Sequence, residues 1–237
     1  LRLYNIEGHK LSMGFNIINH TFNPNVVQTE GPQLERFGSS NGVRIQTNEA
    51  ALYLQDEYAI NSRWLLNSGI RLSSNTTAAK TYFNPEPRVG LRYLVDGKNS
   101  VKLSYARMVQ YMHQVSGSSL SLPTDVWYPV TNGVAPGISD QVSTGYYYTI
   151  PAAEITLSAE LYYKSLRNVI EYKEGAQLIM NKDYEKELVS GKGNSYGMEL
   201  FVSKTTGKFT GWLGYTFSYA KRRFDSLNNN QAYYARH

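Results

Sequence analysis

The feature that most constrains the fold is an alternation of apolar and polar residues that continues for longer than a usual strand. In the segment 155–172 the two sets are Ile155, Leu157, Ala159 and Leu161 against Thr156, Ser158 and Glu160. Successive side chains of a strand point to opposite sides, so this segment is a strand with one apolar and one polar face. Strands usually run about five or six residues, whereas a tilted strand of about 9–11 residues crosses a bilayer. One such strand leaves both a soluble sandwich and a membrane barrel open.

The same alternation recurs along the chain and predicts nine strands. They are expected near 9–22, 46–60, 63–76, 82–95, 100–113, 139–150, 154–172, 193–205 and 208–224. Short turns are expected at 61–62, 96–99, 151–153 and 206–207, and long loops at 23–44, 74–81, 114–138 and 174–192. Tight turns at one end and long loops at the other are the layout of an outer-membrane barrel. We therefore expect an all-β, antiparallel, up-and-down transmembrane barrel wall, with the loops 23–44, 114–138 and 174–192 on the outside of the cell.

In a membrane barrel each face of the strands meets its own medium. The apolar face contacts lipid, and the polar face lines a wet lumen where ionised side chains stay hydrated. Closure also hides the sheet edges, whose unpaired backbone groups would each cost several kcal/mol in hydrocarbon. The residues expected to face lipid are Leu52, Leu54, Leu91, Leu103, Leu157, Leu161 and Leu213. Those expected to face the lumen or a plug inside it are Arg71, Arg88, Arg92, Lys102, Glu160 and Glu199.

The composition agrees with a barrel and excludes other classes. Tyr is abundant, at 20 residues against 8 Phe and 3 Trp, which suits a boundary between oil and water, although Tyr is also simply a good strand former. No run of 18 apolar residues is present, which excludes a transmembrane helix, and a mean hydropathy of −0.43 is compatible with strands whose two faces average out. The absence of Cys excludes thiolate sites. Only 221–223 form a basic run, so nucleic acid is not an expected partner.

Several stretches resemble the C-terminal barrel of TonB-dependent outer-membrane receptors. They are "ALYLQDEYAINSRWLLNSGIRLS" (51–73), "YFNPEPRVGLRYLVDGKNSVKLSYARMVQ" (82–110), "AELYYKSLRNVIEY" (159–172) and "GNSYGMELFVSKTTGKFTGWLGYTFSYAKRRF" (193–224). The second is the closest in pattern, with a Pro-Glu-Pro-Arg-x-Gly entry, a turn and a Val-Lys-x-Ser-Tyr-x-Arg exit. The order and spacing of these stretches, which cover most of the chain, carry the resemblance more than any one of them does.

The resemblance implies a barrel of about 22 strands in the outer membrane of a Gram-negative bacterium. It implies import of a scarce nutrient (an iron chelate, haem, cobalamin, a glycan or a peptide) with energy from the TonB-ExbB-ExbD complex. The implied partners are outer-membrane lipid, the protein's own N-terminal plug domain and a surface lipoprotein. The nine strands expected here cannot close such a barrel, and the chain shows no plug, no TonB-contacting segment and no terminal aromatic residue. We therefore expect an interior piece of a longer protein.

Candidate binding residues gather in one loop and on one polar strand face. Amphipathic aromatic groups and polar neighbours that could grip a ligand at the outer mouth are Trp127, Tyr128, Asp125, His113 and Tyr147. The plainer reading is that the loop 118–136 folds over the barrel rim or anchors in the lipid interface. The same choice applies to Tyr147, Arg88 and Arg92, which would contact either substrate or plug.

Catalytic and metal chemistry find little support in the sequence. His9, His20, His113 and His237 are scattered without metal-ligand spacing, and "SGKGNSYG" at 190–197 lacks the frame of a phosphate loop. No catalytic residue, metal or cofactor is expected. The alternatives that remain are an outer-membrane barrel that acts as an enzyme or adhesin, and a soluble secreted β-sandwich binding module.

Overall fold

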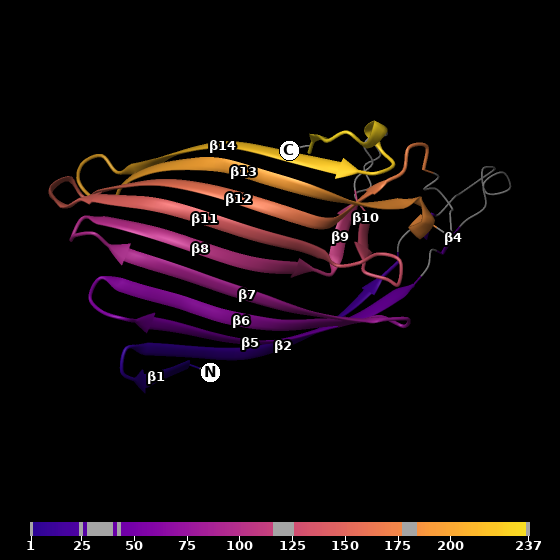
Figure 1. Cartoon of the computed structure of the whole chain (residues 1–237), viewed down its shortest axis with the longest axis horizontal. Coiled ribbons are helices and arrows are strands. Elements are labelled where there is room, and N and C mark those ends of the chain that lie inside the picture. Colours follow the sequence, from indigo (N-terminus) through magenta and orange to yellow (C-terminus); the bar gives the residue numbers. More distant parts are fainter. Residues whose placement is uncertain are drawn as a thin grey trace.

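The computed structural model describes residues 2–23, 26–27, 40–41, 44–115, 126–176 and 184–235. Nine long strands dominate it (Figure 1): β2 (His9–Phe22), β5 (Ile45–Ala59), β6 (Trp64–Thr76), β7 (Thr81–Leu94), β8 (Asn99–Gln110), β11 (Gly137–Ile150), β12 (Ile155–Tyr172), β13 (Leu188–Lys204) and β14 (Gly211–Phe224). Each long strand pairs antiparallel with its neighbour along the chain. The expected antiparallel, up-and-down all-β architecture is confirmed.

Two short strands complete this sheet at its edges, and both were missed by the sequence reading. β1 (Arg2–Ile6) pairs with β2, and β15 (Tyr233–Tyr234) pairs with β14, which makes an open sheet of 11 strands. Two small hairpins lie outside it, β3 (Val26–Val27) with β4 (Ser40–Asn41) and β9 (Met112–Val115) with β10 (Val126–Pro129). The described helices are the short 3-10 turns Pro151–Ala153, Tyr184–Glu187 and Asn228–Asn230, none of them long enough to cross a membrane.

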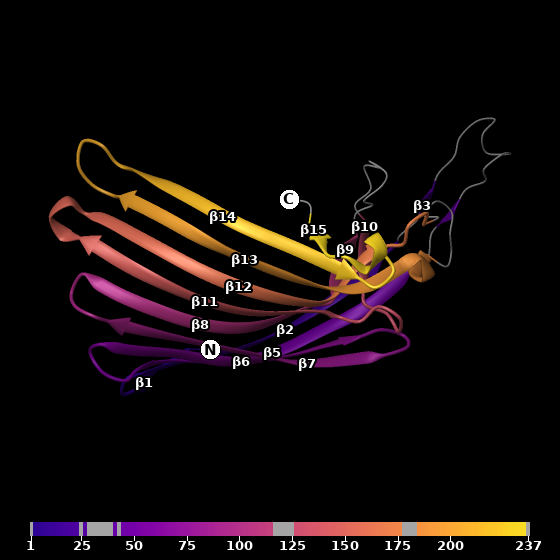
Figure 2. The ribbon, with the colours of Figure 1, turned by 45° about the horizontal axis from the view of Figure 1, so that its top comes forward.

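The sheet is bent into a trough, with the tight turns at one end and the longer connections at the other (Figure 2). Two of the tight turns are closed by side chains that accept backbone N–H groups. Asn61 Oδ1 accepts from the backbone N–H groups of Arg63 at 2.9 Å and Trp64 at 3.0 Å, and Asp96 Oδ1 accepts from those of Lys98 at 2.7 Å and Asn99 at 2.8 Å. These hydrogen bonds hold the pKa of Asp96 below its usual value.

The loop end differs from the sequence expectation in three places. The prediction of a loop at 74–81 is wrong, because β6 and β7 continue up to a four-residue turn. In this turn the Thr77 N–H donates to the Lys80 carbonyl at 2.9 Å. The loop expected at 174–192 is too long, since β13 already begins at Leu188. The loop expected at 114–138 contains the β9–β10 hairpin, and its residues 116–125 lie outside the described part of the chain. Most of 23–44 lies outside it as well.

Strand pairing fixes which side chains share a face, because residues directly opposite one another in antiparallel strands point the same way. The seven leucines Leu52, Leu54, Leu91, Leu103, Leu157, Leu161 and Leu213 all lie on the outward face by this register. The apolar side chains on that face are exposed, with Leu213 72% exposed and Phe15 78% exposed. Such a large apolar surface would be an aggregation hazard in water and is the expected exterior of a membrane barrel.

One irregularity changes the alternation of β12 near its loop end. The register with β13 shifts between Arg167 and Val169, and Asn168 between them has a φ of +55°. Asn tolerates this left-handed conformation better than most residues, so the residue type fits a β-bulge. Asn168 Nδ2 also donates to the Pro136 carbonyl at 2.8 Å, which ties the bulge to the segment that follows β10. Beyond the bulge, Ile170 and Glu171 are buried.

Candidate functional site

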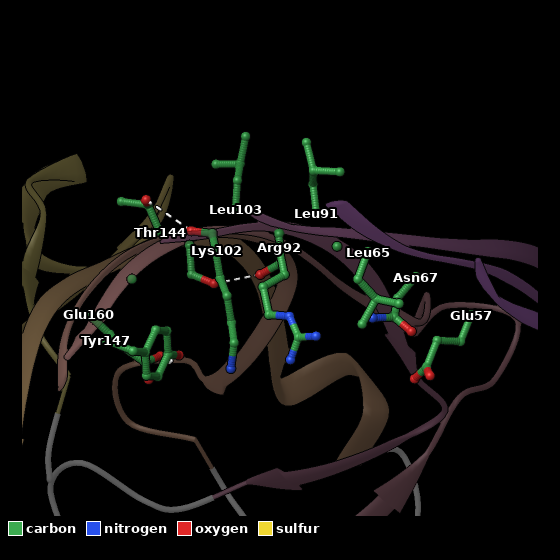
Figure 3. Close-up of a pocket in the computed structure, with 14 residues that line it drawn as sticks. Glu57, Leu65, Asn67, Leu91, Arg92, Lys102, Leu103, Thr144, Tyr147 and Glu160 are labelled. Atoms are coloured by element: carbon green, nitrogen blue, oxygen red, sulfur yellow. Dashed lines mark hydrogen bonds between the residues drawn. The ribbon is translucent and has the colours of Figure 1, made fainter. Parts of the chain in front are cut away.

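The concave face of the trough carries the charged residues of the long strands. The register places Arg71, Arg88, Arg92, Lys102, Glu160 and Glu199 there, opposite the leucine face. Figure 3 shows the division directly: Leu91 and Leu103 point to one side of the sheet, whereas the neighbouring Arg92 and Lys102 point to the other. Whether this face borders a water-filled lumen or a plug stays a prediction.

A hollow of about 360 Å³ lies on this face over β5 to β12 (Figure 3). Lys102 Nζ lies 4.0 Å from the centre of the Tyr147 ring, and the Tyr147 hydroxyl donates to Glu160 Oε1 at 2.7 Å. The Nε of Arg92 is buried without a hydrogen-bond partner in the described part of the chain. A buried N–H without a partner costs about 1–3 kcal/mol, so an acceptor from another part of the protein would stabilise Arg92 here.

A second set of charges crosses the same face toward the loop end. Arg71 donates to Glu86 Oε1 at 2.9 Å and to Glu49 Oε1 at 3.2 Å, and Glu86 is only 2% exposed. The other oxygen of Glu86 accepts the Val109 N–H at 3.3 Å. Pro85 and Pro87 flank Glu86 and have no N–H to donate, and backbone pairing of β7 with β8 runs only from Arg88 to Leu94. The Glu86 carboxylate thus joins the strands where their ladder stops.

The β9–β10 hairpin folds over the concave side at the loop end (Figure 2). β10 contacts β2, and β9 contacts β12, so the hairpin bridges strands that are far apart in the sheet. Its core is the buried cluster of Val115, Tyr128, Val134 and Ile170, with Ile45, Tyr172 and Leu188 packed against it. These flanking residues come from β5, β12 and β13, so one apolar cluster connects the two sides of the trough.

Polar contacts fix the segment that follows this hairpin. Glu185 accepts the Thr131 hydroxyl and the Gly133 N–H, the latter at 3.0 Å. The Tyr82 hydroxyl donates to the Thr131 carbonyl at 2.7 Å, and that of Tyr128 donates to Glu185 Oε2 at 3.4 Å. The connection from β10 to β11 is therefore held by β7 on one side and by the 184–187 turn on the other.

The β9–β10 hairpin brings three of the five residues expected to bind substrate together, because Tyr128 lies directly opposite His113 and next to Trp127. Trp127 is 49% exposed on the hairpin, while its neighbour Tyr128 is buried in the hairpin core. His113 is also buried, with Nε2 donating to the Ala135 carbonyl at 3.1 Å, and burial lowers its pKa. Tyr147 lies in the hollow on the sheet instead, and Asp125 lies outside the described residues.

Tyr128 and His113 are buried in the hairpin, and the contact of these five residues with a ligand stays a prediction. The sequence reading missed Glu86 and Glu185, which organise the loop end. The Pro-Glu-Pro pattern around Glu86 was a usable signal, because proline interrupts a strand ladder. Where the pairing of β7 with β8 stops, the Val109 N–H is left to a side-chain acceptor, and Glu86 supplies it.

Known proteins share this architecture. The family model described as "TonB dependent receptor-like, beta-barrel" matches residues 2–237. Solved structures that match include the FrpB iron transporter from Neisseria meningitidis (TM-score 0.66, 14% identity, 97% of this chain and 36% of that chain). The ferripyoverdine receptor of Pseudomonas aeruginosa, bound to ferripyoverdine, also matches (TM-score 0.63, 15% identity, 95% and 31%), as does the copper transporter OprC (0.63, 12%, 97% and 37%). A comparison with curated protein sequences finds no match.

The chain spans about a third of the length of these solved structures, so its open sheet corresponds to part of a barrel wall. At 12–15% identity these structural similarities support the fold alone. The family match extends over nearly the whole sequence. The chain belongs to the TonB-dependent receptor-like β-barrel family of Gram-negative outer-membrane proteins.

Proposed function

We propose that this chain is part of the wall of a receptor that imports a scarce nutrient across the outer membrane with energy from TonB, and that it catalyses no covalent chemistry. The substrate class is an iron chelate, haem, cobalamin, a glycan or a peptide. The similar structures named above are an iron transporter, a ferripyoverdine receptor and a copper transporter, which supports a metal or metal-chelate cargo within that range.

The observation that carries the proposal is the pairing of a charged concave wall with a hairpin folded over its loop end. The wall presents Arg92 with an unsatisfied N–H beside Lys102 and Glu160. Such a surface suits a polar plug domain, which would supply the missing acceptor and would move when TonB pulls. The hairpin narrows the loop end, where a ligand would be captured.

Within that hairpin, Trp127 is the residue best placed to touch a ligand, because it is exposed and stands next to a rigid core. Trp127→Ala should weaken substrate binding by about 1–2 kcal/mol, as loss of an aromatic contact does, without unfolding the hairpin. A matched control is Trp64→Ala, a Trp at the opposite, turn end of β6, which should leave binding unchanged.

Import is tested on the intact receptor in cells. A strain that lacks the receptor should lose uptake of one labelled nutrient, and uptake should return with the wild-type gene only while TonB and the proton gradient are present. Uptake that persists without TonB would point to a passive channel. Binding without any uptake would point to an adhesin, and conversion of the ligand to product would point to an enzyme.

A further inference from the structure

Along the outward face of the sheet, the side chains change from apolar to aromatic and then to charged toward the loop end. One row of directly paired residues across β8 and β11–β14 is Tyr105, Val142, Tyr163, Tyr196 and Tyr219. On the turn side of this row lies the exposed apolar surface that contains Leu103, Leu161 and Phe217. A row of aromatic residues at the border of an apolar band marks the membrane–water interface of an outer-membrane barrel. The residues beyond this row therefore lie at the depth of the lipid headgroups.

These residues beyond the tyrosine row form a charged group that we call the outward basic cluster. Its members are Arg107, Asp140, Arg167, Lys192, Lys221 and Arg223. The register pairs Arg167 with Lys192 and Lys192 with Arg223, so three cations stand side by side on three successive strands. The cluster has five cations and one carboxylate, all on the face that carries the leucines.

The single carboxylate of the cluster orders two of its cations. Asp140 accepts Arg107 Nε at 2.7 Å and an Arg167 terminal nitrogen at 2.7 Å, and the Tyr105 hydroxyl donates to it at 2.7 Å. The Arg167 side chain remains 44% exposed, so its other guanidinium nitrogens are open to a further acceptor. Asp140 thus holds two guanidinium groups in place but neutralises only one of them.

The other cations have even less compensation. Lys192 and Arg223 are exposed, and neither forms an ion pair within the described part of the chain. Lys221 Nζ lies 5.0 Å from the centre of the Tyr234 ring, and no carboxylate pairs with it among the described residues. A row of solvated surface charges would be the plain interpretation on a soluble protein. At headgroup depth the same row meets anionic groups instead of bulk water.

We propose that the outward basic cluster binds the phosphate of an anionic lipid in the leaflet at the loop end. Guanidinium groups match phosphate oxygens through paired N–H donors, and the adjacent tyrosines offer a flat apolar surface for the upper part of the acyl chains. The lipid would lie along β11–β14, on the outside of the barrel. This inference depends on the membrane orientation of the sheet and not on nutrient import, so either can fail alone.

The test is native mass spectrometry of the intact receptor, titrated with single lipids. The probes are phosphatidylglycerol and lipid A, both with exposed anionic phosphate, against zwitterionic phosphatidylcholine. The variant is Lys192→Gln/Arg223→Gln, two exposed residues whose loss breaks no ion pair within the described part of the chain. The control is Lys98→Gln/Lys208→Gln, which removes the same charge from exposed positions in the tight turns.

Near an anionic membrane surface each cation contributes about five-fold in affinity. The Lys192→Gln/Arg223→Gln variant should therefore bind at least one of the two anionic lipids about 25-fold more weakly, and added salt should shrink the difference. The control should bind both lipids as the wild type does. Equal weakening in both variants, or equal affinity for phosphatidylcholine, would overturn the proposal. Displacement of the lipid by inorganic phosphate at the same concentration would show a site for free anions and would overturn it too.

Discussion

A charge placed on either face of β13 and β14 distinguishes a membrane barrel from any soluble arrangement. Leu200 lies on the outward face, opposite Ala159 and Tyr215, and is 40% exposed. Thr216 lies on the concave face, directly opposite Glu199. We expect Leu200→Arg to destabilise the folded receptor strongly and Thr216→Arg to have little effect, because only the first would place a guanidinium in hydrocarbon.

The magnitude follows from the position of Leu200 along its strand. Leu200 is four positions from Tyr196 in the tyrosine row, and four positions from Lys204 at the turn end. At about 3.3 Å per residue and a tilt of about 45°, Leu200 lies about 9 Å below the interface, near the middle of an apolar band about 25 Å tall. An Arg at that depth costs about 2–4 kcal/mol, whereas the guanidinium introduced by Thr216→Arg would have Glu199 as a partner. We therefore expect a cost of about 3 kcal/mol for Leu200→Arg against less than about 1 kcal/mol for Thr216→Arg.

The assay is guanidinium unfolding of the intact receptor in lipid vesicles, followed by tryptophan fluorescence. The unfolding midpoint should move for Leu200→Arg at an unchanged dependence on denaturant, and Leu200→Met serves as the neutral control. A larger loss for Thr216→Arg than for Leu200→Arg would refute the assignment of the two faces.

Three further outcomes follow from individual contacts. Glu86→Ala should lower the free energy of unfolding by about 3 kcal/mol in the same assay. Breaking a buried ion pair costs about 3–5 kcal/mol, and Arg71 keeps a second partner. A loss below about 1 kcal/mol would contradict the role given to Glu86. The pKa of Asp96 is lowered in the fold, so the ionised carboxylate stabilises the fold above its ordinary pKa, and this contribution is lost as pH falls. The melting temperatures of wild type and Asp96→Ala should therefore converge in acid. A constant difference between them would contradict this. Burial lowers the pKa of His113 below its ordinary value, so the hairpin should lose stability as pH falls. Residues 112–115 should therefore exchange amide hydrogens faster, relative to intrinsic rates, at about pH 5.5 than at about pH 7.5. A pH dependence that persists in His113→Gln would contradict this.

Much of the sheet could be predicted because it depends on local chemistry. The two-residue period that divides Leu103 from Lys102 is a property of any strand, and the turn at Asp96 follows from residues that close turns in any fold. The short edge strands could not be found in this way. β15 has two residues, too few for a period to show, and its pairing is settled by the neighbouring β14.

The loop end was harder to predict because its contacts are between residues distant in the sequence. Tyr128 carries the same residue type as an exposed ligand contact, yet Ile170 and Val134 bury it. The 74–81 segment contains Asn, Thr and Lys, which favour a loop, but Asn75 is buried within a paired strand and donates to the Thr47 hydroxyl. Polar residues can continue a strand where partners satisfy them, and those partners are set by the tertiary structure.

The medium that each face of β8 contacts can be measured residue by residue in the intact receptor. Single cysteines carrying a spin label at residues 101–106, in a background without other cysteines, would be exposed to oxygen, which concentrates in lipid, and to a water-soluble nickel complex. We expect high oxygen contact at Val101, Leu103 and Tyr105, and low oxygen contact at Lys102, Ser104 and Ala106. A reversed alternation, or equal contact at all six positions, would contradict it.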